Sequence, residues 1–215
     1  MNYLFTETVA KGSQKPELVK MVQAVVGVMQ NGTFGDYTEK MVKKWQKAHG
    51  VQETGVVGPT TWNFMFANKA IKQKALQIAA TQLGVREHGG WNRGKDVDKY
   101  NMSCLGVVGV AWCCTFMWWC FMQAARSLGL KMPFPHTGYV PDVYRFAVES
   151  GRLTRKPEAG DLMLLKSEDG LHSHIGFVVK DKGNGVVSTL EGNTNFLGSP
   201  EGDGVYRKER RKATL

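Results

Sequence analysis

The chain has 215 residues, with 28 Lys and Arg against 19 Asp and Glu and a formal net charge of +9. Its 42% hydrophobic content is ordinary for a globular protein and excludes a disordered or low-complexity chain, and the length suits one medium domain plus a small one. The positive charge favours polyanionic surroundings, but no aromatic-basic nucleic-acid motif accompanies it, so we expect no nucleic-acid partner.

Neither export nor a membrane span is predicted. Residues 1–7, MNYLFTE, lack the basic region followed by an apolar region that marks a secretory signal. The longest apolar stretch, roughly 107–125, is marginal in length for a membrane helix and has no flanking basic anchors. We therefore expect synthesis in the cytoplasm and no stable membrane insertion, and we expect a monomer.

The first part of the chain contains an internal repeat. A G-x-apolar-G-x-x-T motif occurs at residues 32–38 and again at residues 55–61. Each copy predicts a glycine turn that leads into a helix. Asp36 and Glu39 form a D-x-x-E capping pattern in the first copy, and Pro59 suits a first helical position in the second. Together with an earlier helix over 18–29, the repeat predicts a small three-helix domain.

This small domain resembles the peptidoglycan-binding domain of many cell-wall lytic enzymes. The motifs that carry the resemblance are Val22-Gln23, Asn31-Gly32-x-Phe34-Gly35-x-x-Thr38, Val42-x-x-Trp45-Gln46 and Gly55-x-Val57-Gly58-Pro59-x-Thr61-Trp62. The family usually has Asp where Asn31 and Thr54 stand, and Phe where Trp45 stands. We interpret Phe34, Trp45 and Trp62 as core residues rather than direct sugar contacts.

Helices precede strands in the rest of the chain. Residues 67–70 are either a short linker or a helix continuation, and helices are predicted over 71–83, 96–100, 113–128 and 140–150. Strands are predicted over 161–166, 174–181, 186–191 and 204–207. This order indicates an α+β fold, with domains at 1–68 and 69–215 and helices packed on an antiparallel sheet in the second.

Four cysteines, at 104, 113, 114 and 120, fall close together. They form no C-x-x-C pair, so a zinc ribbon is not expected, and on a helix Cys113 and Cys120 lie about 10 Å apart, too far for a disulfide. Cys114 and Cys120 are interpreted as small buried apolar residues. Cys113 differs because it stands at a predicted helix N-terminus, where free N–H groups and the helix dipole stabilise a thiolate.

His174 alone among the five histidines begins a predicted apolar strand. With a four-residue loop between this strand and the next, residue 181 pairs with 186 and residue 174 with 193. His174, Glu191 and Asn193 then fall on one side of the sheet. His172 is the rival base, and we expect it outside the strand.

The second domain resembles the CHAP family of cysteine amidohydrolases and peptidases, within the NlpC/P60-like, papain-like group, over residues 75–206. The matching motifs are Trp112-Cys113-x-x-Phe116-x-x-Trp119, Pro157-x-x-Gly160-Asp161-Leu162, His174-Ile175-Gly176-Phe177-Val178 and Glu191-Gly192-Asn193-Thr194. The resemblance implies Cys113 as nucleophile, His174 as base, and Glu191 or Asn193 as the group that orients the imidazole. Glu191 is favoured, because a carboxylate also stabilises imidazolium.

With both domains, the chain looks like a modular bacteriophage endolysin. That resemblance implies peptidoglycan as partner and cleavage of a wall amide bond, as an N-acetylmuramoyl-L-alanine amidase or an endopeptidase, after release from the host cytoplasm. The alternative is a catalytically inactive wall-binding or virion structural module. Glu87, Asn92 and Asp96 are candidates for the groove wall, with loop and cap roles as the alternative. No calcium loop of the D-x-D-x-D type is present, so we expect no metal and no cofactor.

Overall fold

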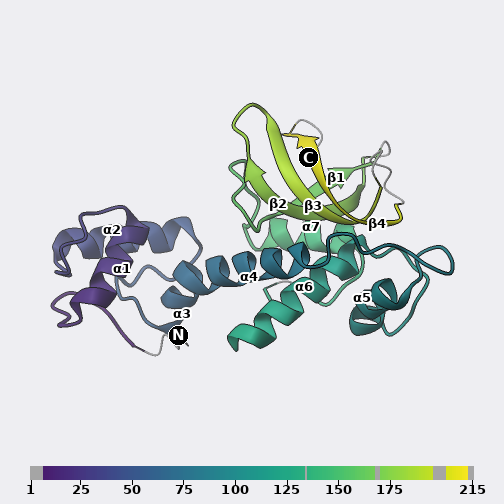
Figure 1. The fold of residues 1–215 in the computed structure, drawn as a ribbon. Coiled ribbons are helices and arrows are strands. Elements are labelled where there is room, and N and C mark those ends of the chain that lie inside the picture. Colours follow the sequence, from purple (N-terminus) through teal and green to yellow (C-terminus); the bar gives the residue numbers. More distant parts are fainter. Residues whose placement is uncertain (1–6, 134, 168–169, 196–201, 213–215) are drawn as a thin grey trace. The chain divides into compact units, whose positions relative to one another are not determined.

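The computed structural model describes residues 7–133, 135–167, 170–195 and 202–212 (Figure 1). The chain divides into two compact units, Met1–Ala70 and Ile71–Leu215. Residues 67–70 continue a helix, so the linker alternative is wrong. Residues 1–6, on which the expected lack of a secretory signal rests, lie outside the described residues. Within the described part of the chain, no helix has both the length and the apolar character needed to cross a membrane.

Helices built around one small core form the first unit. They are α1 (Pro16–Val26), α2 (Asp36–Ala48) and α3 (Pro59–Trp62), followed by a π-helical turn, η1 (Asn63–Ala67). The next helix, α4 (Asn68–Ala80), begins in this unit, and its buried residues belong to the core of the second unit. Phe34 and Trp62 are buried in this core, as interpreted from the sequence, and Trp45 packs against it partly buried. The apolar faces of the short helices therefore meet in a single cluster.

The first copy of the repeat is held by a buried glutamine from α1. Gln23 Oε1 accepts a hydrogen bond of 3.0 Å from the backbone N–H of Gly32. Its Nε2 donates to the carbonyl oxygen of Thr33 at 3.0 Å and to Oγ1 of Thr38 at 3.3 Å. A single side chain thus satisfies the backbone of the glycine turn and the threonine that ends the motif.

Gln46, at the equivalent place in α2, binds the second copy in the same way. Its Oε1 accepts from the N–H of Gly55 at 2.8 Å, and its Nε2 donates to the carbonyl oxygen of Val56 at 2.9 Å and to Oγ1 of Thr61 at 3.0 Å. Gln23 and Gln46 are 1% and 0% exposed. The repeat is therefore a structural unit made of a helix, a glutamine and the glycine turn that follows it.

The predicted D-x-x-E cap of α2 is wrong. Gly35 is the N-cap residue and has no side chain to accept a hydrogen bond, while Asp36 lies inside the first turn. Asp36 instead pairs with Lys11, and Glu39 pairs with Lys43 at 2.6 Å. Both carboxylates still lie at the positive end of the helix dipole, which favours them there.

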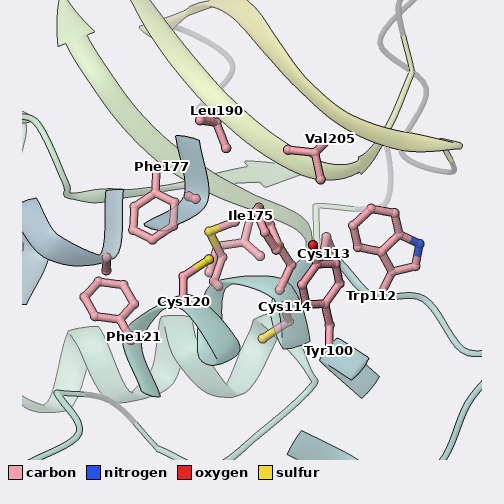
Figure 2. Close-up of a cluster of buried hydrophobic side chains, with 14 of the residues drawn as sticks. Tyr100, Trp112, Cys113, Cys114, Cys120, Phe121, Ile175, Phe177, Leu190 and Val205 are labelled. Atoms are coloured by element: carbon pink, nitrogen blue, oxygen red, sulfur yellow. The ribbon is translucent and has the colours of Figure 1, made fainter. Parts of the chain in front are cut away.

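The second unit is α+β, as predicted. Its remaining helices are α5 (Lys95–Leu105), α6 (Cys113–Leu128) and α7 (Val140–Glu149), and its antiparallel sheet has the order β1 (Leu162–Lys166), β2 (His172–Asp181), β3 (Val186–Thr194), β4 (Gly204–Arg211). Figure 2 shows the apolar cluster between α6 and the sheet, which includes Cys120, Ile175, Phe177 and Leu190. This cluster fixes the N-terminus of α6 against β2 and β3.

Several element ends differ from the predicted ones. Helix α4 ends at Ala80 rather than at residue 83, and α5 continues five residues beyond the predicted end at 100 to Leu105. Strand β4 continues to Arg211, so nearly all of the basic tail, residues 206–212, is part of the sheet. The tail lacks apolar alternation, and pairing with β3 along the whole strand stabilises it instead. Helix α6, by contrast, has the predicted bounds of 113–128.

The hairpin between β2 and β3 has two registers. Near the turn Asp181 pairs with Val187, so the predicted pairing of 181 with 186 is wrong. An irregularity in the middle of the strands absorbs this shift, and Phe177 pairs with Leu190, in the alignment that the sequence predicts. The pairing of β2 with β3 begins at Phe177, so the predicted alignment holds at Phe177 and Val178 but does not extend to the predicted pair of His174 with Asn193.

Candidate functional site

Cys113 is the first residue of α6, and Trp112 is its N-cap residue. The first N–H groups of a helix have no partner within the helix, so this end carries free donors and a partial positive charge. The thiol is almost buried, with 7% of the residue exposed. Cys113 therefore combines a small opening to solvent with the end of a helix that favours a thiolate.

The other three cysteines are structural. All four are free and buried. Burial raises the pKa of Cys114 and of Cys120 well above the usual thiol value, and raises the pKa of Cys104 to about 11. Cys114 points away from the site, with Sγ 3.5 Å from the carbonyl oxygen of Thr137. These thiols stay protonated at neutral pH and are poor nucleophiles.

His174 connects Cys113 to Glu191. It is 2% exposed, and its Nε2 lies 3.0 Å from Oε2 of Glu191. Its Nδ1 makes no hydrogen bond of ordinary geometry within the described residues. Because Nε2 is occupied by Glu191, Nδ1 is the ring nitrogen left to interact with the Cys113 thiol. The proximity of this thiol affects the pKa of His174. Cysteine, imidazole and carboxylate thus lie in series.

The surroundings of His174 and Glu191 favour their charged forms. Burial alone lowers the pKa of His174, but the contacts with Cys113 and Glu191 outweigh it and raise the pKa to about 9. Burial alone raises the pKa of Glu191, but Arg210 and His174 outweigh it and lower the pKa to about 2. An imidazolium held by a carboxylate can donate a proton to a reacting group, so His174 is suited to act as a general acid.

Glu191 is fully buried and accepts four hydrogen bonds. Oε1 accepts from Thr189 Oγ1 at 2.5 Å and from Arg210 Nε at 2.9 Å. Oε2 accepts from Arg210 Nη2 at 2.6 Å in addition to the bond with His174. Such a fully satisfied carboxylate has one fixed orientation. Sequence reasoning missed Thr189 and Arg210, because the unbroken charged run around Arg210 carries no alternation that could indicate an inward-facing residue.

Asn193 Oδ1 and His174 Nδ1 do not bind each other within the described residues, and Glu191 is the residue that binds Nε2. Asn193 is 2% exposed, has a left-handed φ of 54°, and lies where the pairing of β3 with β4 shifts by one residue. Its Oδ1 is buried without a partner in the described residues. The preceding Gly192 lies so close to α6 that a β-carbon there would be 2.5 Å from Phe116 and 2.8 Å from Trp112. The bulge thus brings the Asn193 segment against the start of α6.

His172 lies within β2, so the prediction that it stands outside the strand is wrong. Its ring stacks on Tyr144 of α7, with centroids 3.9 Å apart. Burial and the nearby Lys166 lower the pKa of His172. The interactions of His172 are therefore with α7 and β1, whereas those of His174 are with Cys113 and Glu191.

Glu87 links the glycine-rich loop to the start of α6. Its Oε1 accepts from Nε1 of Trp112 at 2.8 Å, and its Oε2 accepts from the backbone N–H of Asn92 at 2.8 Å. Asp96 lies in the first turn of α5 and pairs with Lys99 at 2.9 Å. Among the three groove-wall candidates, Glu87 thus contacts the residue next to Cys113, while Asp96 has the helix-end role given as its alternative.

Two hollows on the surface lie away from this site. One of about 550 Å³ is lined by charged residues of α2 and by Glu53, and one of about 450 Å³ is lined by residues of α4 and the sheet, including Arg207. Neither is lined by Cys113 or His174. Within the residues that the structure describes, no group of three or more His, Cys, Asp or Glu side chains is arranged to hold a metal ion.

Comparison with protein families gives two matches. Residues 18–65 match the peptidoglycan binding domain, and residues 106–193 match the CHAP domain. No match was found among curated proteins or among solved structures. The second match includes Cys113, His174 and Glu191 and ends at Asn193, so Arg210 lies beyond it. The chain thus carries a peptidoglycan-binding domain followed by a CHAP domain, and this combination indicates a peptidoglycan hydrolase.

Proposed function

We propose that the chain cleaves an amide bond of peptidoglycan by thiol catalysis, with Cys113 as nucleophile, His174 as base and acid, and Glu191 as the orienting group. The observation that supports this most strongly is the buried hydrogen bond between His174 and the Glu191 carboxylate, with Cys113 acting on the same imidazole. The Trp112–Cys113 helix end supplies the nucleophile and free N–H donors in the same place.

In the first step the Cys113 thiolate attacks the carbonyl carbon of the substrate amide, and an S–C bond forms. The negative charge that develops on the carbonyl oxygen is stabilised by N–H groups at the start of α6. The C–N bond then breaks, and the His174 imidazolium donates its Nδ1 proton to the leaving nitrogen. The products of this step are a free amine and a thioester on Cys113.

In the second step water attacks the thioester carbonyl, and the neutral His174 accepts its proton at Nδ1. The C–S bond breaks, a carboxylic acid leaves, and the thiolate–imidazolium pair is restored. Glu191 holds Nε2 throughout, so the other ring nitrogen remains directed at the reacting atoms. Asn193 is the second polar residue that we assign to the site, as the CHAP resemblance implies.

The first unit then serves to hold the enzyme on the wall and to raise the local substrate concentration. We further propose the role of an endolysin, made in the host cytoplasm and acting on the wall after release, as either an N-acetylmuramoyl-L-alanine amidase or an endopeptidase. Both activities cut an amide, and the same thioester chemistry serves both.

Mass spectrometry of digested peptidoglycan tests the proposal. Purified walls with different cross-links are incubated with the full chain and with Cys113→Ala, and the new termini are identified. An amidase separates glycan from peptides that begin with L-alanine, whereas an endopeptidase leaves the peptides on the glycan and cuts within them. Binding to the wall without any Cys113-dependent new terminus would indicate the inactive wall-binding or structural module instead.

A further inference from the structure

Arg210 on β4 binds the Glu191 carboxylate side-on, through two different nitrogens. Nε donates to Oε1 at 2.9 Å, and Nη2 donates to Oε2 at 2.6 Å. The Arg210 side chain is 16% exposed and that of Glu191 is 0% exposed. A paired, planar Arg–carboxylate contact of this kind is both strong and directional, and burial reduces its screening by water.

The pairing of β3 with β4 explains how Arg210 reaches Glu191. Arg210 pairs with Val187, and Tyr206 pairs with Glu191. Alternate residues of a strand share a face, so Val187, Thr189 and Glu191 lie on one face of β3, and the Arg210 side chain extends along it. Thr189 stands between the two ends and donates to Oε1 of the same carboxylate. The basic tail therefore completes the surroundings of a residue in the site.

The carboxylate needs this partner at one stage of the reaction in particular. After His174 has given its proton to the leaving amine, Glu191 faces a neutral ring. A buried carboxylate without a counter-charge takes up a proton, because burial disfavours its charged form. The guanidinium of Arg210 supplies this counter-charge through two hydrogen bonds.

We propose that Arg210 is a positioning residue of the site, which keeps Glu191 ionised and directed at His174 throughout the reaction. This inference rests on the proposed function. It assigns a role to a residue outside the matched CHAP segment, which ends at residue 193. Arg210 acts through Glu191 and His174 and touches no reacting atom.

The charged and titratable groups that act on Glu191 come from three elements. They are His174 on β2, Arg210 and Lys208 on β4, and Cys113 on α6, which acts through His174. The Lys208 ammonium group donates to the carbonyl oxygen of Asn195 at 2.7 Å rather than to the carboxylate. Of Lys208 and Arg210, only Arg210 is hydrogen-bonded to Glu191 within the described residues.

The test measures the reactivity of Cys113 towards iodoacetamide across pH, in the full chain. The reaction consumes the thiolate and needs no wall substrate, so it can fail or succeed independently of the proposed function. Fragment mass spectrometry of the labelled peptide separates Cys113 from Cys114. The variants are Arg210→Met, Arg210→Lys, Glu191→Gln and the double variant Arg210→Met/Glu191→Gln. Arg207→Met is the matched control, because it removes an exposed arginine from the same strand.

We expect Arg210→Met to move the acid limb of this profile to higher pH, because Glu191 then protonates more easily and its hold on the imidazolium weakens. Arg210→Lys should shift the limb less, since one ammonium group cannot serve both oxygens in the planar geometry, and Arg207→Met should not shift it. Turnover on peptidoglycan should fall about 10- to 100-fold in Arg210→Met, mainly in kcat, as for other hydrogen-bond partners that orient a functional group.

The double variant separates a positioning role from a structural one. If Arg210 acts through Glu191, then Arg210→Met should produce no further shift in the Glu191→Gln background. Circular dichroism identifies any variant that fails to fold, and for such a variant the comparison is made with Arg210→Lys. An unshifted profile in both Arg210 variants would overturn the proposal. A shift of equal size with and without the Glu191 carboxylate would overturn it as well.

Discussion

Gly176 on β2 lies directly beneath the Glu191 side chain: a β-carbon at residue 176 would be 2.6 Å from Glu191 Cγ. The same β-carbon would be 3.0 Å from the end of the Met163 side chain. Real β-carbons do not approach other atoms so closely, so any larger residue displaces the carboxylate from His174. The glycine of the His-Ile-Gly motif is therefore required by the site rather than by a turn.

Gly176→Ala should accordingly reduce turnover strongly while leaving most of the fold intact, with a loss of about 1–3 kcal/mol in the free energy of unfolding from overpacking. Activity on peptidoglycan and chemical denaturation measure the two effects. Gly35→Ala is a suitable control, because a β-carbon there has no neighbour within 4 Å. Wild-type turnover in Gly176→Ala would show that the displaced carboxylate is not needed.

The pH dependence of kcat/KM should report His174. Its imidazolium must be present to protonate the leaving nitrogen, and its pKa is raised to about 9 in the free enzyme. Activity should therefore persist through neutral pH and fall as pH rises through about 9. His174→Ala should be nearly inactive, whereas His172→Ala should keep both the rate and the profile, because His172 stacks on Tyr144 instead. Equal losses in the two variants would contradict the assignment.

The free energy of unfolding should depend on pH through His174 and Glu191. The pKa of His174 rises from 6.5 to about 9 on folding, so its contribution is complete below about pH 6.5 and is lost as pH rises through 9. The pKa of Glu191 falls from 4.5 to about 2, so its contribution is complete above about pH 4.5 and is lost as pH falls towards 2. Denaturant unfolding across pH should show a weaker acid-side slope in Glu191→Gln. An unchanged slope would show that folding does not lower the pKa of the Glu191 carboxyl.

The two buried glutamines should be the main polar supports of the first unit. Gln23→Ala leaves the Gly32 N–H buried without its acceptor, and Gln46→Ala does the same to Gly55. An unsatisfied buried donor costs about 1–3 kcal/mol, so each variant should lower the free energy of unfolding by at least that amount. Gln14→Ala, an exposed glutamine, is the matched control. Thermal and denaturant unfolding measure the stability of each variant. Equal stability of all three variants would contradict the prediction.

The sequence predicted the parts of the site that depend on local patterns. The bounds of α6 follow from Trp112 before the helix and Gly129, which has a left-handed φ of 65°, after it. The strand alternation and the short loop were enough to align Phe177 with Leu190. Both features are set by neighbours along the chain, which sequence reasoning handles well.

The parts that the sequence did not predict depend on pairing between distant segments. His172 belongs to β2 because Lys166 pairs with it across the sheet. The basic tail forms β4 because β3 offers it a ladder of backbone hydrogen bonds, and Arg210 then reaches Glu191. Charged residues are ordinarily solvated, so a run of them gives no sequence signal for a strand, and the predicted strand ended at residue 207. Glu191 was favoured over Asn193 at His174 on chemical grounds, whereas the irregularity of β3 at Asn193 has no local signature.

The central claim is that Cys113 is the nucleophile. It is tested most directly by measuring the rate at which Cys113→Ala and Cys114→Ala release new amines from purified peptidoglycan. The thiols are adjacent in sequence, but Cys113 contacts His174 while Cys114 is buried against Thr137. The account predicts that Cys113→Ala releases no amines while it remains folded, and that Cys114→Ala keeps most of the wild-type rate. Release by Cys113→Ala at a rate near that of the wild type, or loss confined to Cys114→Ala, would contradict it.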